Sequence, residues 1–193
     1  MNATTHAIFG VGALAGAALL TGTEPHVYAY PLAVVAAWLP DVDNPRSRLG
    51  NGLSRMKSPL LNTLTRPVSW MLKTISFVLV RAVGHRTLTH SLLGFALLFL
   101  FLRLIPGSHP GLLLAFVAGY ASHLFADALN TRGVPLLWPL GRPFRLLPGG
   151  IRSGGTVEFV VALVAVLLTA YALFLVYPAL REILGFLKPL QGL

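Results

Sequence analysis

Long apolar runs with almost no charged residues constrain the fold of this chain more than any other feature. The 193 residues are 55% hydrophobic and 11% charged, and their mean hydropathy is +0.73, whereas a soluble domain carries about 25% charged residues. Because a run of about 20 apolar residues crosses a bilayer as a helix, the sequence predicts an all-α integral membrane protein. No hydrophilic block is long enough to fold separately, so we expect one domain over residues 1–193.

Breaks at Gly, Pro and charged residues divide the apolar sequence into about five expected spans. These are residues 5–22, 27–39, 91–105, 111–129 and 156–177. Residues 68–83 hold two cations among apolar neighbours, a pattern typical of a helix that lies on the membrane surface. Gly12 and Gly16 have the spacing of helices that approach one another closely.

The distribution of cations predicts the orientation in the membrane. With five spans, the N-terminus, residues 41–90 and residues 130–155 lie on one side, which holds twelve of the fifteen Lys and Arg residues. The positive-inside rule places this side in the cytoplasm. Membrane topology thus explains the net charge of +9, and we expect membrane lipid, but no nucleic acid, as a partner.

The third expected span is directly preceded by a polar cluster with the sequence GHRTLTHS. Burying such groups is costly unless they are paired or bind a metal, which makes them candidate site residues. His85 and His90 can reach one site only if the following helix begins near Thr89 or Ser91, both of which are N-cap residue types. Anchoring to lipid phosphate is the alternative role of Arg86.

His123 and Asp127 are four residues apart in the fourth expected span, so they project from one helix face at a spacing that suits two ligands of one metal ion. An interhelical hydrogen bond is the alternative. Asp41 and Asp43 also fit an ordinary turn, and Glu158 also fits a negative charge at a helix N-terminus. Further candidates fall at helix ends on the same side of the membrane: His6, Asp41, Asp43, His85, His90 and Glu158.

Because the chain has no cysteine, only His and carboxylate side chains can hold a metal ion. These nitrogen and oxygen donors number more than four, which suits zinc, manganese or a two-metal site. A metal-bound water next to an arginine is an arrangement that can hydrolyse a phosphoester. Binding of an anionic substrate and attraction to anionic lipid both account for the cations Arg142, Arg145 and Arg152.

Several of these motifs resemble those of the YdjM-like family of bacterial inner-membrane, metal-dependent hydrolases. The resemblance covers residues 5 to about 158 and rests on Thr5-His6, Leu39-Pro40-Asp41-Val42-Asp43, Gly84-His85-Arg86 with Thr89-His90-Ser91, His123-x-x-x-Asp127-x-x-Asn130 with Gly133-Val134, and Trp138-Pro139. It implies a multi-span hydrolase of the bacterial inner membrane.

The order of these residues is also similar to the ligand order of zinc-dependent phospholipase C and P1-type nucleases. That similarity implies metal-ligand roles for His6, Asp41, His90, His123 and Asp127. The later HxxxE pair of those enzymes is not found here, because Glu158 has no histidine four residues before it. The chain therefore departs from their full three-metal pattern.

We therefore expect a metal-dependent hydrolase that cleaves a phosphoester in a lipid or lipid-linked substrate at the cytoplasmic face. One or two divalent ions are expected, zinc first, with manganese or magnesium as alternatives. The expected ligands are His6, Asp41, His85, His90, His123 and Asp127. Asp43 or Glu158 would orient water or accept a proton, and Arg86 with Arg152 would stabilise phosphoryl charge.

Two other classes of protein compete with the hydrolase. In the first, a non-catalytic membrane scaffold or regulator, a metal ion would staple the helix ends together. The second, a transporter, is disfavoured because the polar residues gather at one face and none marks a path across the bilayer. Activity against lipid phosphoesters would separate the enzyme from the scaffold.

Overall fold

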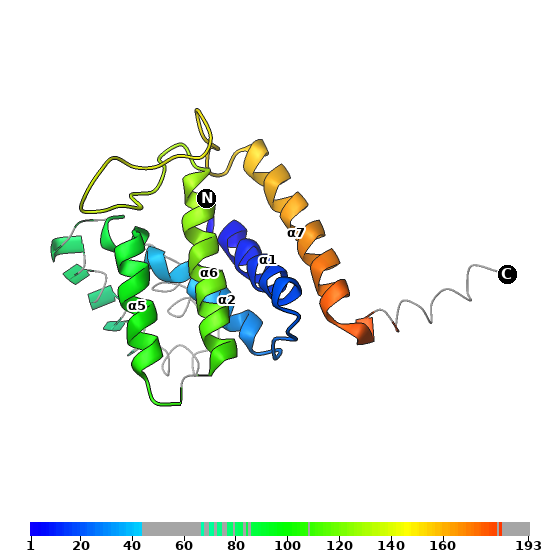
Figure 1. Ribbon diagram of the computed structural model, residues 1–193. Helices are drawn as coiled ribbons and strands as arrows, with labels where there is room; N and C mark the ends of the chain where they lie inside the picture. The colour runs from blue at the N-terminus through cyan, green and yellow to red at the C-terminus, as the bar shows by residue number, and fades with distance from the viewer. Residues whose placement is uncertain are drawn as a thin grey trace.

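The computed structural model is a bundle of α-helices (Figure 1), and it describes residues 1–43, 67, 70, 71, 73, 74, 77, 78, 80–82, 84, 86–107, 109–180 and 182. The helices are α1 (Ala3–Thr21), α2 (Ala29–Trp38), α5 (Leu92–Leu104), α6 (Pro110–Ala128) and α7 (Thr156–Val176). Two 3-10 turns, η1 (Leu39–Asp43) and η3 (Leu88–His90), follow α2 and precede α5. The described residues contain no strand longer than an isolated bridge.

Helix length separates these elements into two groups. α1, α6 and α7 have 19, 19 and 21 residues and are apolar enough to cross a membrane. α2 and α5 are apolar but have 10 and 13 residues, which corresponds to about 15 and 20 Å, whereas the bilayer core is about 30 Å thick. The helices confirm the expected all-α membrane bundle. The described positions between residues 67 and 82 are helical, and their place on the membrane surface stays a prediction.

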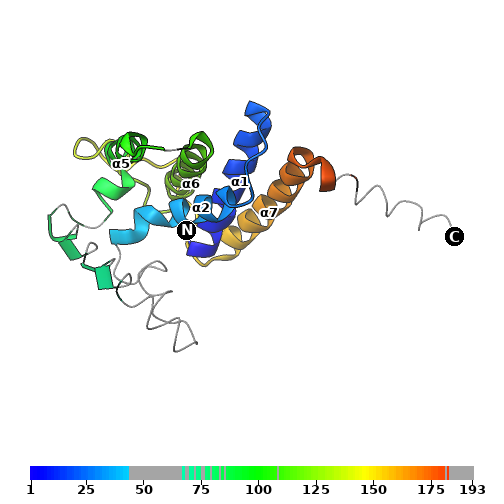
Figure 2. The same ribbon diagram turned by 90° about the horizontal axis from the view of Figure 1, so that it is seen from below.

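α6 is the centre of the bundle and packs against α1, α2 and α5. In its most apolar 18-residue window 61% of the residues are buried, whereas in α7 only 6% are. α7 packs mainly against α1, and the view from below shows it at the edge of the bundle (Figure 2). The exposed side chains of α7 are almost all apolar, as expected for a helix in contact with lipid.

Glycines bring three helices together at a single residue of α2. A Cβ added at Gly10 of α1 would lie 2.9 Å from the carbonyl oxygen of Ala33, and one added at Gly119 of α6 would overlap the same oxygen. A Cβ added at Gly12 would lie 2.5 Å from the hydroxyl oxygen of Thr169 in α7. The expected close packing is therefore observed at Gly12. It was wrong for Gly16, where an added Cβ would meet nothing within 4 Å.

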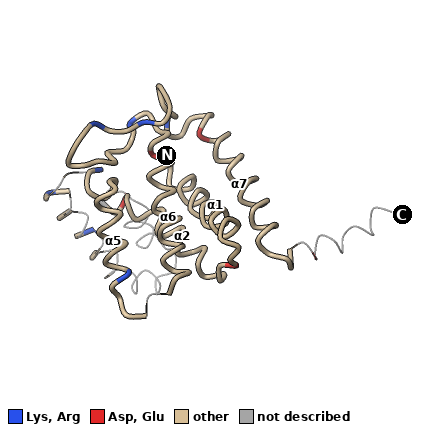
Figure 3. The backbone as a smooth tube through the Cα atoms, in the orientation of Figure 1, with Lys and Arg blue, Asp and Glu red and all other residues tan. Residues whose placement is uncertain are grey.

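The loop from residue 129 to residue 155 folds over the end of the bundle where α6 finishes and α7 begins (Figure 1). Two backbone hydrogen bonds hold it there, from Leu146 N to Ala128 O at 2.8 Å and from Ile151 N to Leu129 O at 2.7 Å. The N-terminus lies at the same end (Figure 1). Exposed cations gather on this loop (Figure 3), namely Arg132, Arg142, Arg145 and Arg152.

Candidate metal centre

Five side chains with metal-ligand chemistry meet at this end of the bundle. They are His6 of α1, Asp41 of η1, His90 of η3, and His123 and Asp127 of α6. Asp41 is 28% exposed and the other four are at most 1% exposed. The structure therefore brings together all of the predicted ligands except His85, which lies outside the described residues.

The four elements reach this point through local features that the sequence contains. The spacing of four residues puts His123 and Asp127 on one face of α6, and the ring of His6 stacks on the ring of His123 with centroids 3.9 Å apart. Ser91 ends η3 and caps α5, because its hydroxyl accepts a hydrogen bond from Gly94 N at 3.0 Å. This cap confirms the expectation that the helix begins just after His90.

The distances between neighbouring ligand atoms are close to those around a bound ion, and the atoms form two groups of three that share His123. Two atoms held at about 2.0–2.1 Å in tetrahedral geometry lie about 3.3–3.4 Å apart. The observed separations are His123 Nε2 to His90 Nε2, 3.3 Å; His6 Nε2 to Asp127 Oδ1, 3.4 Å; His90 Nε2 to Asp41 Oδ1, 3.5 Å; and Asp127 Oδ2 to His90 Nε2 and His123 Nε2, 3.7 and 3.8 Å. The donor set and its spacing therefore fit a divalent metal ion.

A backbone carbonyl fixes which nitrogen of His123 faces the cluster. Nδ1 of His123 lies 2.7 Å from Ala37 O, and because a carbonyl oxygen only accepts, Nδ1 must carry the proton and donate it. Nε2 then has a free lone pair, the arrangement that metal-binding histidines commonly have. Because the two groups of three, His6 with His123 and Asp127, and Asp41 with His90 and His123, share this residue, they share one nitrogen atom.

An unpaired nitrogen also points to a ligand that comes from outside the chain. Among the described residues, Nδ1 of His6 is the one buried side-chain nitrogen or oxygen without a hydrogen-bond partner. Native structures leave few such atoms unpaired, and a bound ion or water is a common reason for one.

Positive charges surround the buried carboxylate of Asp127. The guanidinium of Arg86 pairs with Oδ2, and the amino group of Met1 lies 2.8 Å from Oδ1. Arg86 also donates to Gly133 O at 3.4 Å, and its backbone adopts a positive φ of 56°, which is uncommon for a residue other than glycine. The predicted position of Arg86 beside the histidines is thus observed, and its partner is a candidate ligand.

Asp41, in the middle of η1, is a charged candidate ligand at neutral pH. Burial acts to raise the pKa of its carboxyl group, but the hydrogen bond to His90 and the electrostatic influence of the nearby imidazoles lower this pKa to about 2. Together with Asp127 it offers two anionic oxygens against three imidazoles, a mixture that zinc and manganese accept.

Two of the remaining predicted residues, Glu158 and Arg152, lie outside the cluster. Glu158 is buried at the start of α7, where Asn2 N and the hydroxyl of Thr5 donate to Oε1 at 2.6 and 2.8 Å, and Gly154 N donates to Oε2 at 2.5 Å. It therefore joins α7 to the first turn of α1 and belongs to neither ligand group. Arg152 is exposed on the loop. The side chain of Asp43 lies outside the described residues, and the catalytic roles given to these three residues stay predictions.

Sequence reasoning missed the contacts made by backbone atoms. The carbonyl of Ala37 carries no chemical signature in the sequence, and only the close packing of α2 against α6 brings it to His123. The hydrogen bonds of Glu158 to the N-terminal turn were also not expected, although a buried glutamate one turn into an apolar helix is a signal that a partner must exist.

The fold and the site define a class of protein: a helical membrane protein with a buried His/Asp cluster that can hold a metal ion. The chain belongs to the YdjM inner membrane protein family, whose model matches residues 1–184. This confirms the resemblance seen in the sequence motifs. The family name and the three membrane-length helices support a location in the inner membrane.

Individual relatives agree with this assignment. The inner membrane protein YdjM of Escherichia coli (strain K12) is 38% identical over 144 residues, which cover 72% of this chain and 63% of the relative, and YdjM of Shigella flexneri gives the same values. The chain thus spans less than two thirds of the length of these relatives. The protein YvsG of Bacillus subtilis (strain 168) is 30% identical over 92% of this chain and 97% of its own. No solved structure matches significantly.

Proposed function

We propose that this protein is a membrane-bound, metal-dependent hydrolase that cleaves a phosphoester in a lipid or lipid-linked substrate. The observation that carries the proposal is the buried cluster of three histidines and two aspartates, whose ligand atoms lie 3.3–3.8 Å apart. Buried imidazoles and carboxylates at the end of membrane helices are costly without a bound partner. In the proposed hydrolase, these side chains bind the metal ion that activates water for hydrolysis.

Each residue of the cluster has a task in this chemistry. His6, His90 and His123 offer neutral nitrogen ligands, and Asp41 and Asp127 offer the negative charge that balances a divalent cation. A metal ion bound there supplies a water of lowered pKa and a positive charge for phosphoryl oxygens. Arg86 is 20% exposed, so its guanidinium reaches both the buried carboxylate and the surface, where it would bind the phosphoryl group.

The two ends of the segment between α2 and α5 lie close together, because Asp41 and His90 flank this segment and are 3.5 Å apart. In a membrane, both ends would then lie on the same side. This supports the interfacial expectation for residues 68–83. The positive-inside rule and the cations of the loop at residues 129–155 then support a multi-pass protein whose site faces the cytoplasm.

The first test measures metal and turnover in the same preparation. Purified protein should contain zinc or another divalent metal at one or two ions per chain, and Asp127→Asn should lower this content well below the wild-type value. His26→Asn is the matched control, because His26 is exposed at the opposite end of the bundle. Unchanged metal content in Asp127→Asn would make the pair of His123 and Asp127 a structural hydrogen bond and not a pair of metal ligands.

Turnover then separates the hydrolase from the metal-stapled scaffold. A panel of phosphatidic acid, phosphatidylglycerol phosphate and prenyl phosphates should yield inorganic phosphate with at least one member. Activity should disappear on chelation and return with metal. Metal bound at full occupancy without hydrolysis of any phosphoester, in a protein that stays folded, would favour the scaffold.

A further inference from the structure

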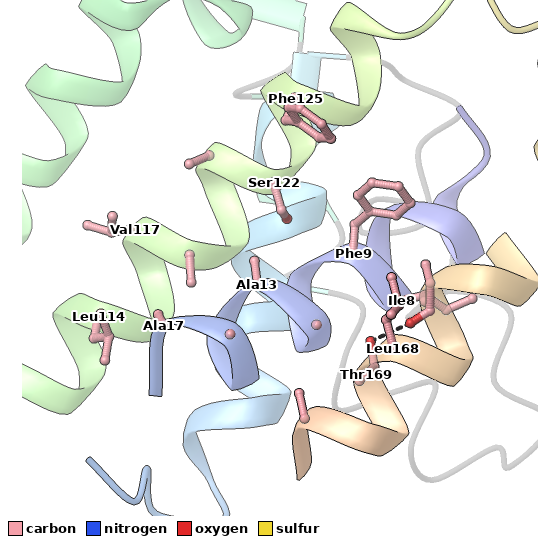
Figure 4. A pocket seen from close by; sticks show the side chains of 16 residues that line it. Ile8, Phe9, Ala13, Ala17, Leu114, Val117, Ser122, Phe125, Leu168 and Thr169 are labelled. Atoms are coloured by element: carbon pink, nitrogen blue, oxygen red, sulfur yellow. Dashed lines mark hydrogen bonds between the residues drawn. The ribbon is translucent and has the colours of Figure 1, made fainter. Parts of the chain in front are cut away.

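A long apolar groove runs between α1, α6 and α7. Its volume is about 600 Å³, within the range of about 300–1,000 Å³ that is common for ligand sites. Figure 4 shows the side chains that line it, which include Phe9 and Ala17 of α1, Leu114 and Val117 of α6, and Leu168 of α7. All three helices are long enough to cross the membrane, so lipid is the surrounding solvent.

One end of the groove lies at the same depth in the bundle as the metal centre. Phe9 follows His6 by three residues, less than one helical turn, and Phe125 lies between His123 and Asp127 in the sequence of α6, on the face of the helix opposite to theirs. The rings of Phe9 and Phe125 approach each other, with centroids 6.3 Å apart, and Figure 4 shows them at the same end of the groove. A molecule in the groove would therefore have one end at the depth of the candidate ligands, across α6 from them.

The length of the groove matches one leaflet of a bilayer. On α6 its lining extends from Leu114 to Phe125, or about 16 Å at 1.5 Å per residue. Half of a hydrocarbon core of about 30 Å is about 15 Å. An acyl chain that entered at the end marked by Phe9 and Phe125 would therefore reach the midplane of the membrane at the far end of the groove.

The groove has no unpaired hydroxyl group that would require a polar ligand. Its two hydroxyl groups already donate within their own helices, from Ser122 Oγ to Gly119 O and from Thr169 Oγ1 to Ala165 O, each at 2.7 Å. An apolar chain leaves no hydrogen bond unmade there, whereas water or a polar ligand would find few partners. Gly16 keeps this space open, because nothing lies within 4 Å of the position of its missing Cβ.

The charge at the entrance fits the other half of such a molecule. The loop that carries Arg132, Arg142, Arg145 and Arg152 is bonded to the last turn of α6, through Leu146 N and Ala128 O. This turn follows directly after Phe125. Cations near the surface of a membrane attract anionic head groups, so the apolar groove and the cationic loop are together complementary to an anionic lipid.

We propose that this groove holds one acyl chain of an anionic phospholipid and thereby keeps its phosphoester at the depth of the metal centre. The inference rests on the proposed function and names its substrate class, a phosphoester with a long alkyl or acyl chain rather than a soluble one. Binding of a remote chain positions the reacting group, so chain length controls the rate as well as the affinity.

The binding test uses a probe that requires no turnover. The probe is phosphatidylglycerol with a diazirine in the middle of one acyl chain, reconstituted with the protein in vesicles of phosphatidylglycerol and phosphatidylethanolamine. Cross-links should map to the lining of α1 and α6. Ala172→Leu narrows the groove from α7, and Ala170→Leu is its matched control, because Ala170 is exposed on the same helix and is not part of the lining.

The expected result is a several-fold loss of groove cross-links in Ala172→Leu and none in Ala170→Leu, at equal metal content. Gly16→Leu should reproduce the loss from the side of α1. Equal cross-linking in all of these variants, or cross-links spread evenly over the lipid-facing surface of α7, would overturn the groove as a binding site.

The activity test distinguishes failure of this inference from failure of the proposed function. The wild-type protein should hydrolyse a long-chain phosphoester at least about tenfold faster than its short-chain analogue, and Ala172→Leu should remove that preference while the short-chain rate remains. Hydrolysis without any preference for chain length would reject the groove and keep the hydrolase. Specific cross-linking without hydrolysis would reject the hydrolase and keep the groove.

Discussion

At the scale of single residues, Asp127 connects more of the site than any other described side chain. Its two oxygens meet imidazole nitrogens of His6, His90 and His123 and the guanidinium of Arg86. A buried carboxylate is stable only when such partners compensate for its lost hydration. Because one arginine and a metal ion would compete for the same oxygens, Arg86 is the residue whose substitution is most informative.

Arg86→Lys keeps the positive charge but loses the planar, bidentate geometry of the guanidinium. If Arg86 binds the phosphoryl group, turnover of a hydrolysed lipid phosphoester should fall by about 10²–10³, while metal content remains near that of the wild type. Arg103→Lys, in the last turn of α5, is the control and should retain full activity. Full activity in Arg86→Lys would leave this residue as an anchor to lipid phosphate.

Glu158→Gln tests whether a buried glutamate holds the metal centre together from a distance. The amide oxygen can replace only one carboxylate oxygen as an acceptor, so a donor from Asn2, Thr5 or Gly154 loses its partner. We expect a loss of about 1–3 kcal/mol in the free energy of unfolding and weaker metal binding, because His6 lies in the turn that Glu158 holds. Thermal unfolding in detergent and a metal titration measure both effects.

Glu24→Gln provides the comparison for this variant, since Glu24 is exposed at the other end of the bundle. It should leave both the unfolding temperature and the metal affinity unchanged. A stable Glu158→Gln protein with normal metal affinity but no turnover would instead return Glu158 to the catalytic role that its sequence position suggested.

At the scale of helices, the hydropathy of the sequence and the spacing of its residues were sufficient to predict much of the architecture. The apolar runs predicted five helices at the observed places, and the four-residue spacing of His123 and Asp127 predicted their common face. The 3-10 turns were not predictable, because η1 and η3 are shaped by contacts with each other. The Ala37 carbonyl also escaped prediction, since every residue has one and only the packing at Gly119 selects it.

This packing can be tested with two identical substitutions. Gly119→Ala places a methyl group against the carbonyl of Ala33, so α2 must move away from α6 and the hydrogen bond from His123 to Ala37 should weaken. Overpacking of this kind costs about 1–3 kcal/mol, and we expect a lower unfolding temperature and reduced metal content. Gly16→Ala adds the same group into open space. Equal behaviour of the two variants would contradict the proposed role of helix packing at the metal centre.

At the scale of the whole molecule, the ends of five helices determine where the site lies. α1, α5 and α7 begin at the end of the bundle that carries the metal centre, and α2 and α6 finish there. An antiparallel bundle of this kind collects residues from distant parts of the chain at one end of the bundle. The cations of the loop at residues 129–155 lie at that end too (Figure 3), so the orientation of the protein in the membrane also decides which side the site faces.

That question has a direct measurement, because the protein contains no cysteine and single cysteines can be introduced without background. Arg142→Cys lies on the loop beside the metal centre, and Glu24→Cys lies at the opposite end, both exposed. If the crowded cations face the cytoplasm, a membrane-impermeant maleimide should label Glu24→Cys in intact cells and should reach Arg142→Cys only after the membrane is opened. Removing one arginine leaves most of the difference in cation number between the two sides in place. The double variant Arg142→Ala/Gly141→Cys is the control, because it tests the reactivity of a cysteine at the neighbouring position. Labelling of Arg142→Cys in intact cells would put the metal centre on the outer face, where a cytoplasmic lipid substrate could not reach it.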